Sequence, residues 1–284
     1  MKRGKVKLTV DKNPIDYSQK WWARLVFFGS VFFLFLPLFA IVFFSFNNSR
    51  RITVWEGFTW NNYGKVMQNS ALIEAFVNSL LVGIIASFVS LILGVFSSYV
   101  LRFFHFRFQS IYRGLLSIPI VIPEICMGLA LLIFFNQVFG SLNIGAPWPF
   151  NLILVICAHI TFCFPFVALV IESRLKLLNM EWVEAAADLG ANEFQIFKDI
   201  VLPYLKPALI SGFLLSLTLS LDDFIITFFT SGPETITFPV KVYSMLRFSV
   251  TPEVNAASSI LIFFTILLTI ISAFLQKKSN PKNT

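Results

Sequence analysis

Charged residues are scarce in this 284-residue chain. Asp, Glu, Lys and Arg together make up 13% of it, against 57% hydrophobic residues. A soluble domain of this length carries about a quarter charged residues, so the composition excludes an ordinary soluble globular protein. Apolar runs that are long enough to cross a bilayer recur along the chain instead. The sequence therefore predicts an all-α, polytopic membrane protein.

Cysteine and histidine are also rare. The three cysteines all lie in apolar segments without metal-ligand spacing, which excludes a disulfide framework and a cysteine-based metal site. Of the two histidines, His159 is expected to bond a neighbouring helix rather than a metal ion. No GxxxxGK followed by Ser or Thr, no HExxH and no GxSxG occurs. We therefore expect a protein that is not an enzyme, holds no metal and does not hydrolyse ATP itself.

Hydropathy predicts six membrane spans within a single transmembrane domain, residues 25–275. The basic stretch 1–24 before it lacks a small-residue cleavage site, so we interpret span one as a retained helix and not as a signal peptide. Residues 276–284 form a short tail. The predicted spans are 25–46, 75–101, 111–139, 150–172, 207–230 and 256–275.

Lys and Arg are distributed unevenly between the two sides of these spans. Seventeen of the 22 fall in the two tails and in the loops after spans two and four. The positive-inside rule then places both termini in the cytoplasm. The net charge of +7 follows from this topology and does not require nucleic acid as a partner. The five on the other side are Arg50, Arg51, Lys65, Lys241 and Arg247.

Two features of the spans and their outer loops leave alternatives open. Trp55 and Trp60 in the outer loop 47–73 are typical of interface anchors, although an aromatic ring there can also stack on a cationic substrate. Pro119 and Pro123 lie in span three, just before Glu124. Proline frees backbone groups in a spanning helix, which is tolerated where the helix lines a cavity, but a packing kink would look the same.

The longest cytoplasmic loop, residues 173–206, is predicted to form two short helices outside the bilayer. Asn179 can cap the first helix and Gly190 can end it, because glycine readily adopts a left-handed conformation. Asn192 and Gln195 have capping-box spacing for the second helix. Pro203 and Pro207 are expected to end the unit before span five. From composition alone, a hairpin packed on the protein's own cytoplasmic face and a hairpin that docks a partner are about equally favoured.

A family resemblance decides between these two hypotheses. The cytoplasmic loop resembles the "EAA---G---------I-LP" loop of ABC importer permeases. The matching residues are Glu184-Ala185-Ala186, Gly190, Ile200 and Leu202-Pro203. The resemblance implies that this loop docks into an ATP-hydrolysing partner subunit, which would bind the ATP and Mg²⁺. It also implies a polar anchor role for Glu184, close packing for Ala185 and Ala186, and the turn for Gly190.

The resemblance narrows further to the spermidine/putrescine importer permeases of the PotC type. It is carried by "HITFCFPFV" (159–167), "SLTLSLDDFI" (216–225), "TSGPETITFPVKVYSM" (230–245) and "TPEVNA" (251–256). It covers nearly the whole chain after about residue 40, and the basic tail 1–20 departs from it. It implies a location in a bacterial inner membrane. It also implies a second homologous permease, two copies of the ATPase and an extracytoplasmic polyamine-binding protein as partners.

Three carboxylates within the spans are the candidate substrate-pathway residues. A central acidic residue costs roughly 2.5–3.5 kcal/mol to insert, so Glu124, Asp222 and Asp223 are suspected of function by default. The spans that hold them contain no nearby Lys or Arg, which suits a multiply charged organic cation. We interpret them as transient counter-charges, with Ser220 as a hydrogen-bonding group beside them; the acidic pathway positions of the resembled family support this.

The helical period offers a competing explanation for part of this set. In a continuous helix over 207–230, five residues share one small and polar stripe that can equally be a helix-packing seam, which leaves Asp223 unexplained. The stripe comprises Gly212, Ser216, Ser220, Asp223 and Thr227.

Other functions remain as alternatives to polyamine import. One is an ABC permease for another small solute, although the acidic trio argues against anions such as sulfate. The other is a proton-coupled secondary transporter that uses the same carboxylates as a relay. This second alternative predicts inverted repeats, which the sequence does not show, and it gives the 184–203 spacing no role.

Overall fold

The structure is a computed structural model that describes residues 21–49, 54–141, 150–248 and 251–279. Within those ranges the regular structure is helical, apart from one isolated antiparallel bridge between Asn47 and Phe58. Residues 1–20 of the predicted tail 1–24 and residues 280–284 of the predicted tail 276–284 lie outside the described residues. In chain order the elements are α1 (Trp21–Ser45), α2 (Asn61–Gln68), α3 (Ser70–Phe103), α4 (Gln109–Val121), α5 (Glu124–Ser141), α6 (Phe150–Lys176), α7 (Met180–Asp188), α8 (Glu193–Ile196), the π-helical turn η1 (Phe197–Val201), α9 (Leu202–Asp222), α10 (Ile225–Thr230), α11 (Phe238–Phe248) and α12 (Pro252–Ser279).

The predicted number of spans agrees with the structure if one broken span is accepted. Five helices of the described chain are long and apolar enough to cross a membrane, namely α1, α3, α6, the continuous unit 193–222 and α12. The pair α4 and α5 passes the same test together, which makes six. The all-α, polytopic class predicted from composition is therefore confirmed.

Span three is not the single helix that was predicted over 111–139. The chain bends by 107° between α4 and α5. Ile122 is extended, with ψ 134°, and Pro123 follows it. Proline disfavours helical backbone in the residue before it and cannot donate a hydrogen bond, so α4 ends here and α5 begins at Glu124.

Span five is also broken, and the continuous helix predicted over 207–230 is wrong. Helix α9 ends at Asp222, and Asp223 is extended with φ −65° and ψ 127°. The six-residue α10 begins at Ile225. The predicted polar stripe is therefore interrupted between Ser220 and Thr227.

The start of span five differs from the prediction in the opposite way. Pro203 and Pro207 do not end the cytoplasmic unit, because α8, η1 and α9 run on as one helix. Pro203 lies in the first turn of α9, directly after the π-helical turn. In an α-helix its ring would crowd the carbonyl four residues earlier, and the wider π-helical turn falls where that carbonyl lies.

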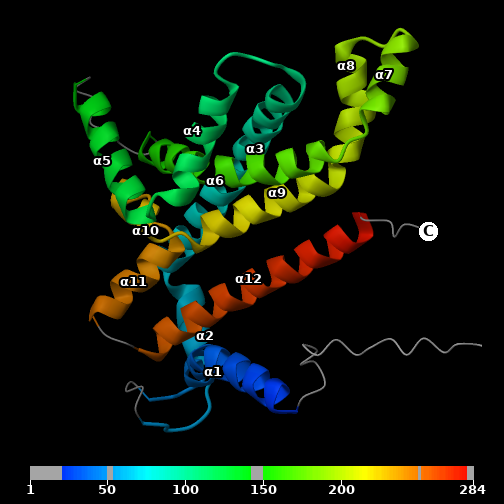
Figure 1. The fold of residues 1–284 in the computed structure, drawn as a ribbon. Coiled ribbons are helices and arrows are strands. Elements are labelled where there is room, and N and C mark those ends of the chain that lie inside the picture. Colours follow the sequence, from blue (N-terminus) through cyan, green and yellow to red (C-terminus); the bar gives the residue numbers. More distant parts are fainter. Residues whose placement is uncertain (1–20, 50–53, 142–149, 249–250, 280–284) are drawn as a thin grey trace, which may run out of the picture.

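The centre of the molecule is built from α3, α6 and α9, which pack on one another. Small residues allow this close approach. A Cβ on Gly94 of α3 would lie 2.8 Å from the Val167 side chain of α6, and a Cβ on Gly212 of α9 would lie 3.3 Å from the same side chain. Helix α12 lies against α9, and α1 packs on α12 (Figure 1). The three central helices thus hold the broken segment after Asp222 at their end.

The two ends of the bundle carry different elements. The α7–α8 hairpin projects beyond the bundle at the end where α1 begins and α12 finishes, whereas α11 lies at the other end (Figure 1). This arrangement matches the predicted location of the hairpin on the same side as both termini. That this side is the cytoplasmic one stays a prediction from the Lys and Arg distribution.

Candidate substrate site and coupling surface

Asp222 is the last residue of α9 and its side chain is exposed. Within the described part of the chain it has no hydrogen-bond or ion-pair partner. An ionised carboxylate that faces hydrocarbon costs several kcal/mol, so the face that carries Asp222 must meet water, a cation or a polar partner. This is the environment expected of a residue that offers charge to a passing cation.

Asp223, the next residue, lies in a different environment. It is 7% exposed, and its carboxylate caps the start of α10. Its Oδ1 accepts from the backbone N–H of Ile226 at 3.1 Å, and its Oδ2 accepts from the backbone N–H and the hydroxyl of Thr227, both at 2.9 Å. The packing seam can therefore explain this carboxylate, because the helix break supplies the hydrogen-bond donors that a continuous helix would lack.

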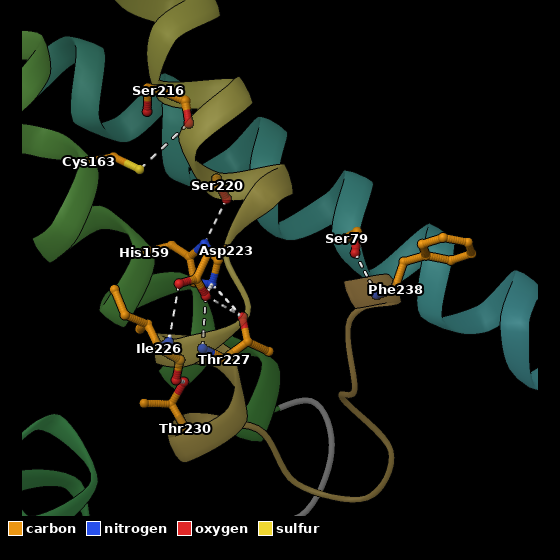
Figure 2. A network of polar contacts seen from close by, with 10 residues as sticks. All are labelled: Ser79, His159, Cys163, Ser216, Ser220, Asp223, Ile226, Thr227, Thr230 and Phe238. Carbon is orange, nitrogen blue, oxygen red and sulfur yellow. Dashed lines mark hydrogen bonds and ion pairs between the residues drawn. The ribbon is translucent and has the colours of Figure 1, made fainter. Parts of the chain in front are cut away.

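Ser220 and His159 complete a buried polar network around the break (Figure 2). His159 of α6 is fully buried, and its Nδ1 lies 2.7 Å from Ser220 Oγ. Its Nε2 lies 2.8 Å from Thr227 Oγ1 and 3.4 Å from Asp223 Oδ2. The prediction that His159 bonds a neighbouring helix is confirmed. Ser220 is 5% exposed, and its hydroxyl faces His159 of α6, the residue that also approaches Asp223.

Glu124 lies at the other helix break, in the first turn of α5, and is exposed. A carboxylate is favourable in the first turn because it offsets the helix dipole. One helical turn later, a Cβ on Gly128 would lie 2.9 Å from Phe229 Cδ2 and 3.5 Å from the carbonyl oxygen of Ile225. The end of α5 that carries Glu124 therefore packs against α10, so the two helix breaks lie in the same region of the molecule. The pathway role of Glu124 stays a prediction.

An aromatic group that includes Phe224, two residues after Asp222, was not recognised from the sequence. The Phe224 and Tyr243 ring centroids lie 4.6 Å apart, and those of Phe224 and Phe228 lie 5.5 Å apart. Phe228 and Tyr243 are 49% and 46% exposed. The spacing of Phe224 and Phe228 is a local signal, but Tyr243 comes from α11, and only the fold brings it here. Exposed aromatic rings can attract an organic cation through their π faces.

The outer tryptophans are both packed against neighbouring rings. Trp55 stacks on Phe43 at 4.6 Å between centroids, and Trp60 meets Phe46 edge-on at 4.9 Å. Both tryptophans remain exposed, as interface anchors are. A contact with substrate stays an untested alternative.

The predicted caps of the α7–α8 hairpin are present. Asn179 accepts from the N–H of Glu181, and Asn192 and Gln195 form the full capping box. Gly190 has φ +84°, and the N–H groups of Gly190 and Ala191 bond the carbonyls of Ala187 and Ala186. This pair of bonds is the Schellman motif, in which glycine takes the left-handed position at lowest cost.

The hairpin has an inner face that packs on the bundle and an outer face that stays open. Ile196 and Val201 are buried with Leu178 and the start of α9. Glu184 and Ala185 are exposed and Ala186 is half-buried. Beyond them, Leu189 is 90% exposed and Phe194 is 71% exposed. Apolar side chains that project so far from a fold are typical of a protein–protein contact.

Comparison with known proteins agrees with this architecture. Residues 86–284 match the family described as the binding-protein-dependent transport system inner membrane component. The chain belongs to this family. As an inner membrane component of a transport system it is a multi-span transport subunit, and the predicted resemblance to importer permeases is confirmed.

Two relatives resemble this inner membrane component over most of their length. The putrescine transport system permease protein PotI of Escherichia coli (strain K12) is 36% identical over 271 residues, which is 95% of this chain and 96% of the relative. The spermidine/putrescine transport system permease protein PotC of Haemophilus influenzae is 36% identical over 248 residues, or 87% of this chain and 93% of the relative. The secondary-transporter alternative is therefore dropped.

A solved structure supports the fold. A chain of a bacterial ABC transporter involved in the import of the acidic polysaccharide alginate superposes with a TM-score of 0.72. The match covers 93% of this inner membrane component and 96% of that chain, at 16% sequence identity. At such low identity the likeness establishes the shared fold and says nothing about cargo.

Proposed function

We propose that this chain is one permease subunit of an ATP-driven importer that carries polyamines, spermidine or putrescine, into the cell. The observation that carries the proposal is Asp222, an exposed carboxylate without a partner in the described chain, at a helix break inside a membrane span. Irregular backbone at membrane depth is tolerated where it lines a water-filled path. The names of the PotI and PotC relatives support the same cargo.

The charge and the aromatic surroundings of the break favour an organic cation over other small solutes. No Lys or Arg occurs from residue 207 to residue 240, so Asp222 has no basic neighbour in its own span. Phe224, Phe228 and Tyr243 add ring faces that attract ammonium groups. An anionic cargo would meet only repulsion here. A different organic cation is the remaining alternative cargo.

The partners follow from the coupling surface and from family membership. We propose that an ATPase subunit docks on the exposed outer face of α7 and α8, with Glu184, Ala185, Ala186 and Gly190 at the contact. ATP and Mg²⁺ would bind to this partner subunit and not to the present chain. Two such subunits, a second homologous permease and an extracytoplasmic polyamine-binding protein complete the importer. The predicted orientation, with both termini in the cytoplasm, puts the hairpin within reach of the ATPase.

Transport by the purified assembly tests this function. The chain is tagged, isolated from its own membranes together with the subunits that copurify, and reconstituted into proteoliposomes with ATP inside. Labelled putrescine, spermidine, butylamine and sulfate are offered outside with the binding protein. We expect ATP-dependent uptake of the two polyamines, little uptake of the monoamine and none of the anion.

Two results would contradict the proposal. Uptake of sulfate without uptake of polyamines would reject cationic cargo altogether. Polyamine uptake that persists without ATP would reject the ATP-driven mechanism. Preferred uptake of another organic cation would retain the importer and replace its cargo.

A further inference from the structure

One buried side chain from another span bonds both sides of the helix break after Asp222. His159 of α6 reaches Ser220 on the near side of the break, at 2.7 Å, and Thr227 on the far side, at 2.8 Å. His159 and Thr227 have no exposed surface. One imidazole therefore ties α9, α10 and α6 together at the point where the backbone leaves the helix (Figure 2).

The hydrogens of this network have one arrangement that satisfies all its members with a neutral imidazole. Thr227 Oγ1 donates to Asp223 Oδ2, so it has no further hydrogen and accepts from His159 Nε2–H. His159 Nδ1 then carries no proton and accepts from the Ser220 hydroxyl. The Asp223 carboxylate receives three donors in all from Ile226 and Thr227. Buried polar networks of this kind are rigid when every group is paired.

We infer that His159, Thr227 and Asp223 form a latch that positions Asp222, and that His159 and Thr227 are positioning residues of the transport pathway. This inference rests on the proposed function and assigns a different role to each of the two adjacent aspartates. Asp223 holds the break, and Asp222 meets the cargo. The latch residues act through the backbone direction after α9, because that direction sets where the exposed Asp222 and the ring of Phe224 lie.

A pair of threonines on α10 gives a matched test. Thr227→Val removes the latch hydroxyl at nearly constant shape, whereas Thr227→Ser keeps the hydroxyl. Thr230→Val makes the same change one turn away, at a buried threonine whose hydroxyl bonds only the Ile226 carbonyl. Each is measured in the reconstituted assembly as uptake per inserted transporter.

The expected result is a loss of about tenfold in polyamine uptake for Thr227→Val, the size of one lost buried hydrogen bond. The Thr227→Ser and Thr230→Val variants should take up polyamines at nearly the rate of the parent protein. His159→Leu should match Thr227→Val; if it fails to insert, the threonine pair carries the test. Equal losses in Thr227→Val and Thr230→Val, or no rescue by serine, would mean general packing damage and would overturn the inference.

A second readout does not depend on the cargo. In a background with Cys126→Ser and Cys157→Ser, which removes the two exposed cysteines, Asp222→Cys is labelled with a membrane-impermeant cationic thiol reagent. We expect Thr227→Val to change the labelling rate of the introduced thiol several-fold at unchanged abundance, and Thr230→Val to leave it unchanged. An unaltered rate in both would reject the positioning role. Because this assay needs no polyamine transport, failure of the latch and failure of the proposed function are distinguishable.

Discussion

Adjacent residues at a helix break can lie in opposite environments, as the exposed Asp222 and the buried Asp223 show. One more residue of α9 would have placed both carboxylates on a regular helix without backbone donors. Because the helix ends at Asp222, Asp223 turns inward and receives N–H groups from the start of α10, while Asp222 stays exposed. A charge that is already satisfied by fixed dipoles is a poor counter-ion, so the free carboxylate is the better candidate for contact with a cation.

Asp222→Asn should abolish most polyamine uptake while membrane abundance and assembly with the ATPase stay normal. The amide keeps shape and removes charge, and the loss of an intramembrane charge eases insertion. Glu124→Gln should behave alike, whereas Glu124→Asp should retain activity. Uptake and abundance are measured together. Full activity in both amide variants would exclude a counter-charge role for these residues.

The polar site was only partly predictable at the residue scale. His159 was expected to bond a neighbouring helix. Its partners Ser220 and Thr227 are 61 and 68 residues away in the sequence, so no local sequence pattern could identify them. The break after Asp222 has no proline or glycine beside it, so the helix was predicted to continue to residue 230. The backbone N–H groups that the break offers to Asp223 were therefore not foreseen. Pro123, by contrast, sits at a break that its own chemistry explains.

The helical elements differ in how far local sequence determines them. The α7–α8 hairpin follows from Asn179, Gly190, Asn192 and Gln195, which act within a few residues, and each was predicted with its role. The continuation of α8 into α9 was not, because the π-helical turn before Pro203 depends on how Val201 and Leu205 pack on α6. Helix caps can be predicted from a few neighbouring residues. A helix that continues through a proline because of tertiary packing cannot be predicted in this way.

Two substitutions in the hairpin should uncouple transport without preventing insertion. Gly190→Pro imposes a φ near −65° where the backbone needs +84°, so it breaks the Schellman turn. Glu184→Lys reverses the charge of an exposed residue on the proposed docking face. Both should stop ATP-driven uptake and weaken copurification of the ATPase.

The matched control for charge reversal is Asp199→Lys, which changes an exposed residue of η1 on the same cytoplasmic segment. It should copurify the ATPase as the parent does. Normal ATP-driven uptake with Glu184→Lys and Gly190→Pro would argue against docking at this hairpin, whereas an equal defect in Asp199→Lys would point to charge in general.

At the scale of the whole molecule, the chain has the surface of one part of a larger assembly. None of the most apolar window of α1 is buried within the chain, against 44% of the corresponding window of α3. Lipid can cover such a helix, but it cannot cover the face that carries Asp222, because a charge there needs water or a polar partner. A second permease subunit that faces Asp222 would enclose a polar path between the two chains.

This assembly works only if the chain is oriented as the Lys and Arg distribution predicts. The predicted topology assigns seventeen of the 22 basic residues to the side that carries the 173–206 loop and the two tails, and such a bias sets orientation during insertion. A phosphatase that is active only outside the cytoplasm, fused after Thr284, should therefore be inactive. The same enzyme inserted at position 57, in the outer loop before α2, should be active, and it controls for expression. The reverse pattern would put the hairpin outside the cell, where there is no ATPase to dock, and would overturn both the topology and the coupling role of Glu184.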